Sequence, residues 1–191
     1  MKRITLLLTF FSLSAFGQNL KAEKINFEVI SNYESLKDST TYSLNKIELQ
    51  NLISNSTKKY TLLISYGFWC KPCQELLPKV LELINHNKDI VEIYIINVEP
   101  DESKRLFLNQ EFLSRRFHFT KPNFMVSEDY GKGKWKKYDA FLLDIIGKDF
   151  NKTYTGMSQN ILYRNGEIVY LSNYNLSDFE IMTDLKKFIE R

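Results

Sequence analysis

The sequence Trp69-Cys70-Lys71-Pro72-Cys73 decides the fold, because it joins two stretches with different apolar patterns. Residues 60–68 form a short apolar run, which predicts a strand buried on both faces. Residues 73–87 carry apolar side chains at helical spacing, which predicts a helix that packs by one face. The two cysteines therefore lie where a buried strand ends and a helix begins.

This position favours a reactive thiol. A helix N-terminus presents unpaired N–H groups and the positive end of the helix dipole, so it stabilises a thiolate on Cys70. Lys71 adds positive charge, and Pro72 fits an early helical position where its missing N–H costs little. Residues three apart share a face of a helical turn, so Cys73 can attack a mixed disulfide formed at Cys70. The pattern predicts dithiol–disulfide exchange, with Cys70 and Cys73 as the candidate catalytic residues.

The N-terminus predicts export. Residues 1–17 begin with a basic pair, continue through a short apolar run and end in small residues, which is typical of a cleavable secretory signal. The run is shorter than the roughly 20 residues of a membrane span, although an uncleaved anchor is an alternative. We therefore expect a periplasmic or otherwise extracytoplasmic protein in an oxidising compartment.

Composition fits one globular domain. The chain has 191 residues, 43% of them hydrophobic, with 7 Gly and 4 Pro, which excludes collagen-like, low-complexity and disordered classes. The signal holds two of the 26 basic residues and no acidic residue, which leaves 24 basic against 23 acidic residues. A chain with nearly equal numbers of basic and acidic residues has no net positive field that would attract a polyanion. We therefore expect no nucleic-acid partner.

The cysteine pair could also serve in three roles without redox exchange. A zinc site needs four ligands, and apart from carboxylates only His86 and His118 could complete it. A structural disulfide across so short a loop would stabilise the fold by only roughly 2 kcal/mol. A reduced, inert pair would fit a cytosolic protein better than an exported one. We expect no metal site and no cofactor.

Beyond the cysteines, strand and helix patterns alternate, and a hairpin signal at Asn165-Gly166 precedes the last helix. This order predicts an α/β fold with a central mixed sheet flanked by helices over residues 41–191, after an N-terminal extension at 18–40. The expected strands cover 25–29, 90–96, 123–126, 160–164 and 167–171, and the expected helices cover 44–53, with Ser43 as N-cap, 102–117, 135–150 and 177–190.

A lysine-rich stretch lies between the expected strands at 123–126 and 160–164. It could form a docking patch for an acidic partner, or simply a solvated loop and helix start. Its lysines are Lys132, Lys134, Lys136 and Lys137, and they surround Trp135 and Tyr138.

On these residues the chain resembles thioredoxin-fold proteins, specifically exported thiol-disulfide oxidoreductases of the TlpA/ResA-like family. The resemblance covers roughly residues 44–191 and rests on the 69–73 motif, on Pro78 and on the hairpin at 162–167 before a final helix. It implies that Cys70 attacks client protein disulfides, that Cys73 resolves the mixed disulfide, and that a membrane electron donor re-reduces the pair. We expect a monomer that acts as a reductant.

One departure from the family pattern concerns the loop that faces the cysteines. Counting eight residues back from Gly166 gives Ser158, where these proteins usually carry a cis-proline. A cis bond before a non-proline residue costs about 2.5–4 kcal/mol, so we expect the Met157–Ser158 bond to be trans. An alternative register places the family proline at Pro122. We expect the substrate groove to be altered and to be lined by Trp69, Lys71, Pro72, Met157 and Ser158.

A second departure is the missing helper carboxylate. The positions where relatives carry an acid hold Leu76 and Ile64, so we expect slower turnover than in a relative with the full motif. Two further functions compete with catalysis. The chain could be a redox-weak binding module for one partner, or a copper-handling thiol protein that uses the cysteine sulfurs as soft ligands.

Overall fold

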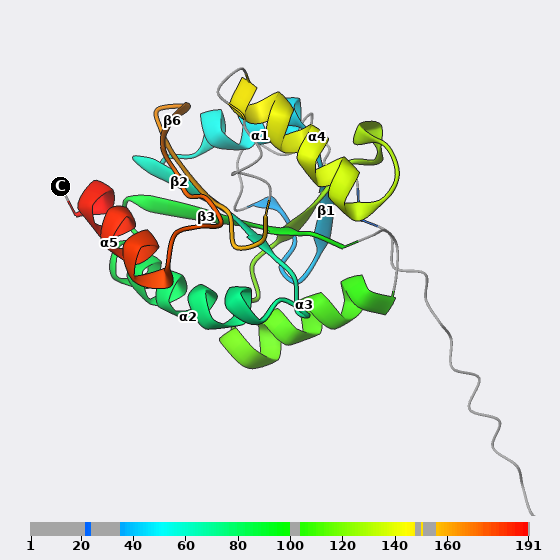
Figure 1. The fold of residues 1–191 in the computed structure, drawn as a ribbon, viewed down its shortest axis with the longest axis horizontal. Coiled ribbons are helices and arrows are strands. Elements are labelled where there is room, and N and C mark those ends of the chain that lie inside the picture. Colours follow the sequence, from blue (N-terminus) through cyan, green and yellow to red (C-terminus); the bar gives the residue numbers. More distant parts are fainter. Residues whose placement is uncertain (1–21, 24–34, 100–103, 148–149, 151–155, 191) are drawn as a thin grey trace, which may run out of the picture.

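The computed structural model describes residues 22–23, 35–99, 104–147, 150 and 156–190. A six-stranded mixed sheet crosses the molecule in the order β1-β4-β3-β2-β5-β6 (Figure 1). Neighbours from β1 to β2 in this order are parallel, whereas β5 is antiparallel to β2 and β6 to β5. The strands are β1 (Thr41–Leu44), β2 (Tyr60–Tyr66), β3 (Val91–Asn97), β4 (Asn123–Val126), β5 (Asn160–Arg164) and β6 (Glu167–Leu171).

Helices cover both faces of the sheet, as the sequence predicted. One layer holds α2, α3 and α5, and the other holds α1 and α4 (Figure 1). The helices are α1 (Lys46–Asn55), α2 (Lys71–His86), α3 (Lys104–Phe117), α4 (Lys134–Ile146) and α5 (Asp178–Ile189), and a 3-10 turn, η2 (Glu128–Tyr130), precedes α4. In the described part of the chain, no helix combines the length and apolarity needed to cross a bilayer.

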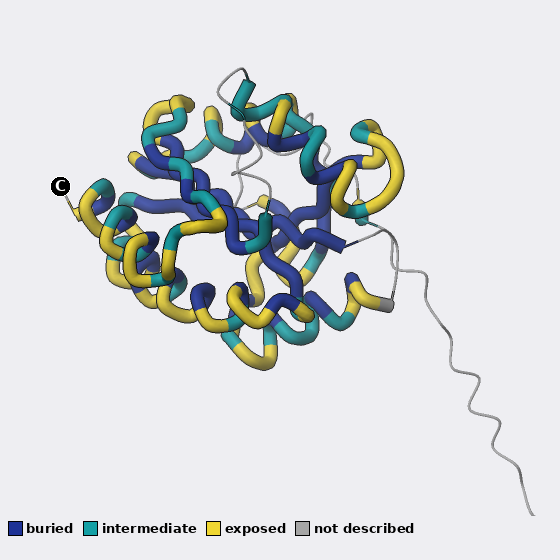
Figure 2. The backbone as a smooth tube through the Cα atoms, in the orientation of Figure 1, coloured by how far each residue is buried: buried dark blue, intermediate teal, exposed yellow. Residues whose placement is uncertain are grey.

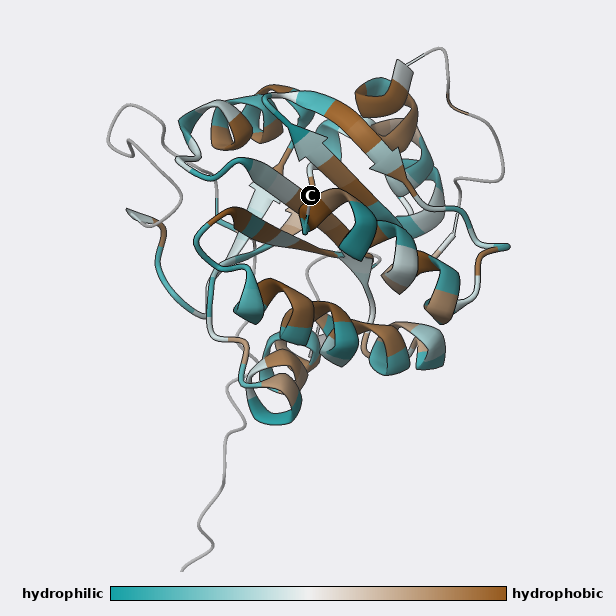
Figure 3. Cartoon of the chain, turned by 90° about the vertical axis from the view of Figure 1, so that its left-hand side faces the viewer, coloured by the Kyte–Doolittle hydropathy of each residue, from teal (hydrophilic) through white to brown (hydrophobic). Residues whose placement is uncertain are grey.

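The two central strands are buried along their whole length. Every residue of β2 and β3 is buried (Figure 2). Alternate side chains of β2 enter opposite cores, since successive residues of a strand point to opposite faces. Leu62 and Ile64 join the cluster under α2 and α5, whereas Leu63 joins the cluster under α1 and α4. Figure 3 shows the hydrophobic colour concentrated on the sheet, with hydrophobic and hydrophilic residues alternating along the helices.

The N-terminal edge differs from the prediction. Residues 41–44 form the edge strand β1, and Ser43 lies within it, so the prediction of Ser43 as a helix N-cap is wrong. The N-cap of α1 is Asn45, whose side chain accepts the Glu48 N–H while the Glu48 carboxylate accepts the Asn45 N–H. This reciprocal capping box satisfies two helix-end donors at once, which fixes the start of the helix.

Part of the predicted extension packs on the domain. Leu36 is buried in the α1/α4 cluster, and Glu23 bridges to Tyr42 in β1. The predicted signal at 1–17 and the predicted strand at 25–29 lie outside the described residues. The helix expected over 135–150 ends earlier, at Ile146, because Gly147 follows with a φ of 75°.

A buried polar network joins α3 to three strands. Asn123 Oδ1 accepts hydrogen bonds from Thr41 Oγ1, at 2.6 Å, and from the Asn97 amide. The amide of Asn109, on α3, donates in turn to Asn97 Oδ1 at 2.7 Å. All four residues are at most 3% exposed, so each lost partner would leave a buried polar group unsatisfied.

We therefore expect Asn123→Ala to lower the free energy of unfolding by about 2 kcal/mol or more, because it strands two buried donors. Asn55→Ala, on the exposed end of α1, is the matched control and should change stability by no more than about 0.5 kcal/mol. Urea unfolding followed by circular dichroism measures both. Equal effects of the two substitutions would contradict a stabilising role for the network.

Candidate active site

The two cysteines form a disulfide at the first turn of α2, at the strand–helix junction where the sequence placed them. Their sulfurs are 2.13 Å apart and their Cα atoms 5.3 Å apart. Cys70 is the N-cap residue of α2, and its Sγ accepts a hydrogen bond from the Cys73 N–H at 3.2 Å. Because the same N–H would face a Cys70 thiolate, the helix start stabilises the reactive form of the reduced pair.

The two residues between the cysteines face solvent. Pro72 lies in the first turn of α2, where a missing N–H removes no helical hydrogen bond. The Lys71 ammonium lies 3.8 Å from Glu75, and its side chain is 87% exposed. Solvent screens the exposed Lys71 charge, and the Glu75 carboxylate partly neutralises it. The helix terminus therefore contributes more to thiolate stability than Lys71 does.

Trp69 is fixed by a buried carboxylate that the sequence patterns did not reveal. Its indole Nε1 donates to Glu99 Oε1 at 2.8 Å. Glu99 follows β3, is 1% exposed, and its second oxygen has no hydrogen-bond partner. Burial raises the pKa of Glu99, while the Trp69 hydrogen bond and the charges of Lys134 and Arg105 oppose that rise. An acidic residue two positions after a continuous buried strand is the signal that could have revealed it.

The start of α4 lies against the same tryptophan. Lys134 Nζ is 3.8 Å from the centre of a Trp69 ring and 5.0 Å from a Trp135 ring. The two indoles meet edge to face, with centroids 5.9 Å apart. A Cβ at Gly67 would lie 2.9 Å from the Trp69 ring, so only glycine lets the indole pack there without a shift. Trp69 thus joins the cysteine turn to a helix of the opposite layer.

The loop before β5 carries the predicted departure from the family pattern. Ser158 has a φ of 62°, is 9% exposed, and has no partner for its hydroxyl. No peptide bond among the described residues is cis, so the Met157–Ser158 bond is trans. Met157 packs against the core cluster that contains both cysteines.

Backbone pairing places Ser158 beside the cysteine strand. The next residue, Gln159, exchanges hydrogen bonds with Ser65 of β2, each 2.9 Å long, and β5 continues that antiparallel pairing. Pro122 instead precedes β4, which pairs with β1 and β3 and not with β2. The topology therefore favours the register with Ser158, rather than Pro122, at the family's proline position.

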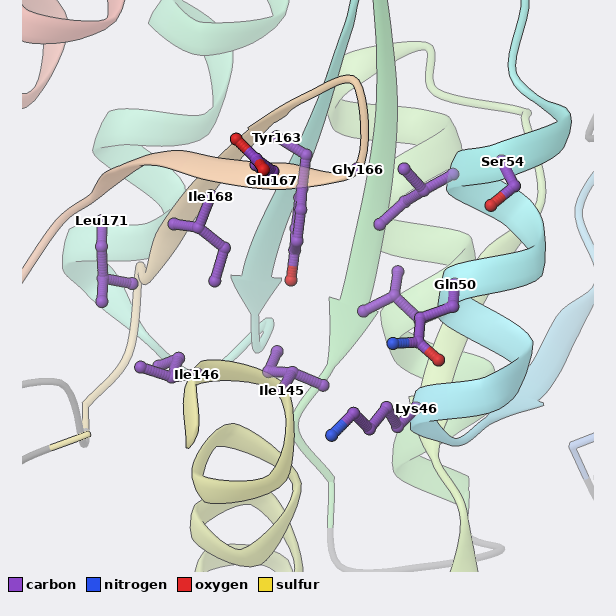
Figure 4. A pocket seen from close by; sticks show the side chains of 12 residues that line it. Lys46, Gln50, Ser54, Ile145, Ile146, Tyr163, Gly166, Glu167, Ile168 and Leu171 are labelled. Atoms are coloured by element: carbon purple, nitrogen blue, oxygen red, sulfur yellow. The ribbon is translucent and has the colours of Figure 1, made fainter. Parts of the chain in front are cut away.

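Two hollows of the surface lie at different distances from the cysteines. A hollow of about 350 Å³ adjoins the cysteine turn, between Phe68 and the α3 residues Leu108 and Phe112. A cavity of about 690 Å³ lies away from the cysteines, between α1, the end of α4 and the β5–β6 hairpin (Figure 4). The described residues contain no group of three or more metal-ligating side chains.

A family model and several solved structures are similar to this chain. The thioredoxin family model matches residues 40–114, which include both cysteines. Similar solved structures include StoA from Bacillus subtilis, with 16% identity, a TM-score of 0.44 and coverage of 67% of this chain and 83% of that one. A DsbF homologue from Corynebacterium diphtheriae shows 12% identity, a TM-score of 0.47 and coverage of 68% and 71%. No curated protein sequence matches significantly. The chain has the thioredoxin fold.

The raised pKa of Glu99 predicts a specific pH dependence of stability. Because the folded pKa lies above the ordinary value of 4.5, the native state binds this proton more readily than the unfolded chain. The resulting stability is present in full below pH 4.5 and is lost as the pH rises through the folded pKa.

Glu99→Gln isolates this effect, because its amide oxygen still accepts the Trp69 hydrogen bond. We expect the free energy of unfolding of the wild type, relative to the variant, to rise as the pH falls from 7 toward 4.5. Urea titrations at several pH values measure the difference. A difference that does not change with pH would refute the assignment.

Proposed function

We propose that this thioredoxin-fold protein is an exported thiol-disulfide oxidoreductase that reduces disulfides in client proteins. The observation that carries the proposal is the Cys70–Cys73 disulfide at the N-terminus of α2, with Cys70 Sγ in the N-cap position. A bond between cysteines only three residues apart adds little stability, whereas this position favours a thiolate and thus exchange.

The proposed reaction runs through a mixed disulfide. The Cys70 thiolate attacks one sulfur of the client disulfide, which forms a Cys70–client bond and releases the first client thiolate. The Cys73 thiolate then attacks Cys70 Sγ, which forms the Cys70–Cys73 bond and releases the second client thiolate. Two electrons pass to the client, and its two thiolates take up protons according to their pKa values.

The client would approach over a surface that the exposed residues define. Trp69 is 38% exposed, and Lys71 and Pro72 face solvent, so these side chains are available to a client. Met157 is half-buried and the Ser158 side chain is buried, so this loop would meet the client mainly through its backbone. Both cysteines are at most 5% exposed, so the client must seat closely before exchange.

The cellular setting completes the proposal. The N-terminal signal pattern and the resemblance to TlpA/ResA-like proteins support a periplasmic or extracytoplasmic location. They also support a reducing direction and a membrane electron donor that restores the dithiol. The direction follows from the reduction potential of the Cys70–Cys73 pair relative to the compartment. We propose that the protein works as a monomer.

Substitution of each cysteine separately tests the reaction. Cys73→Ser should accumulate mixed disulfides with several client proteins, because nothing resolves the Cys70–client bond. Cys70→Ser is the control and should trap far fewer. Non-reducing electrophoresis of extracts from the exported compartment, followed by identification of the partners, measures this. A single trapped partner would instead favour a binding module. The absence of any trapped partner would contradict the proposal.

The Ser158 loop should also slow turnover. We expect insulin reduction to be slower than with a thioredoxin that carries the cis-proline, and Ser158→Pro not to restore the rate. Proline requires a φ near −65°, whereas Ser158 has a φ of 62°, so we expect Ser158→Pro to destabilise the fold by more than about 1 kcal/mol. Ser158→Gly suits the positive φ and should stabilise it by about 1 kcal/mol. A Ser158→Pro variant that folds stably and reduces insulin faster would refute this account.

A further inference from the structure

The beginning of α4 supplies a second set of side chains beside the cysteine turn. We call Trp69, Lys134 and Trp135 the indole–lysine cluster. Its members come from two segments far apart in the sequence, and the Lys134 ammonium lies over both indoles, at 3.8 Å and 5.0 Å. Neither the cysteine motif nor the family match to residues 40–114 includes the α4 part of the cluster.

Buried side chains hold the cluster in place. Trp69 is bonded to the buried Glu99, and the buried Tyr138 hydroxyl, one turn into α4, bonds the Ser65 side chain near the end of β2. These bonds fix the Trp69 indole and the start of α4 before any client arrives. A surface that is already ordered loses less conformational entropy on binding than a mobile one.

The cluster nevertheless faces solvent. Trp69 is 38% exposed and Trp135 is 44% exposed, although burial of so large an aromatic side chain is strongly favourable. Exposed tryptophans that lie together are characteristic of binding surfaces, where they contribute much of the binding energy. Their position next to Cys70 places such a surface where a client disulfide must dock.

The cluster carries and adjoins several basic side chains. Lys132 and Lys136 flank it and are exposed, and Arg105 lies close enough to act on the pKa of Glu99. Acidic residues lie on the same segments: Glu99 accepts from Trp69, Asp129 accepts from Ser127, and Asp139 follows on α4. The charge that lies directly at the exposed indoles is the Lys134 ammonium, so a segment with negative charge complements this point of the surface better than a basic one.

We propose that the indole–lysine cluster selects client segments in which an acidic residue and an apolar residue flank the disulfide. The apolar side chain packs on the indoles, and the carboxylate pairs with Lys134, whose ammonium retains N–H donors while it lies over the rings. The inference rests on the proposed reductase function and specifies its substrate class.

Two synthetic peptides test this selection. Both contain the same disulfide, flanked in one by Glu-Leu and in the other by Lys-Leu. The fully reduced protein is mixed with each, and formation of the Cys70–Cys73 disulfide is followed by rapid acid quenching and alkylation. We expect the acidic peptide to react about 10-fold faster at low salt, with the preference shrinking as ionic strength rises.

Variants of the cluster then locate the effect. Lys134→Gln should bring the ratio of the two rates close to one, and Lys134→Glu should invert it. Trp135→Ala should slow both peptides by a similar factor of about 5, because it removes the shared apolar contact. Lys88→Gln, at an exposed position beyond the far end of α2, is the matched control and should leave the ratio unchanged.

The outcomes separate the two proposals. Equal rates with both peptides in the wild type, or a ratio that Lys134→Gln leaves intact, would overturn the selection while leaving the reductase function standing. Failure of the reduced protein to react with either peptide or with insulin would overturn the reductase function itself.

Discussion

The hydrogen bond from the Cys73 amide to Cys70 Sγ is the contact on which the proposed exchange chemistry depends, and it is set by where α2 begins. It forms only if α2 begins at Lys71. The start of α2 is fixed on one side by β2, which is buried along its whole length, and on the other by Leu76, Leu77 and Val80, which are fully buried under the sheet. The packing of β2 and α2 in the core therefore sets the position of the two cysteine sulfurs.

The residues around the cysteines come from segments that follow the carboxyl ends of the parallel strands. β2 delivers the cysteine turn, β3 delivers Glu99, and the chain after β4 delivers the start of α4. Parallel strands end together, so residues distant in the sequence meet there. Trp69 joins these parts, since it bonds Glu99 and stacks on Trp135, and Gly67 leaves the room that its ring occupies.

The elements that the sequence predicted well are those with a strong local pattern. The buried run before the cysteines, the amphipathic α2 and the hairpin at Asn165-Gly166, where both residues have the positive φ of a tight hairpin turn, all follow from neighbouring residues. The four residues of β1 are too short a strand to show alternation, so the adjacent helix pattern prevailed in the prediction. Glu99 was missed as a site residue, and Trp135 was named only in the lysine-rich stretch and not beside the cysteines, because their contacts join separate elements and leave no periodic signal.

The order β1-β4-β3-β2 has a consequence for how this protein can diversify. Because α4 follows β4, one strand in from the β1 edge, changes confined to α4 alter what surrounds Trp69, while Leu76, Leu77 and Val80 still hold α2 under the sheet. Such changes still reach the cysteine turn, since Trp69 directly precedes Cys70 and packs against Trp135. The residue that adjoins Cys70 therefore limits how far the surface of α4 can vary.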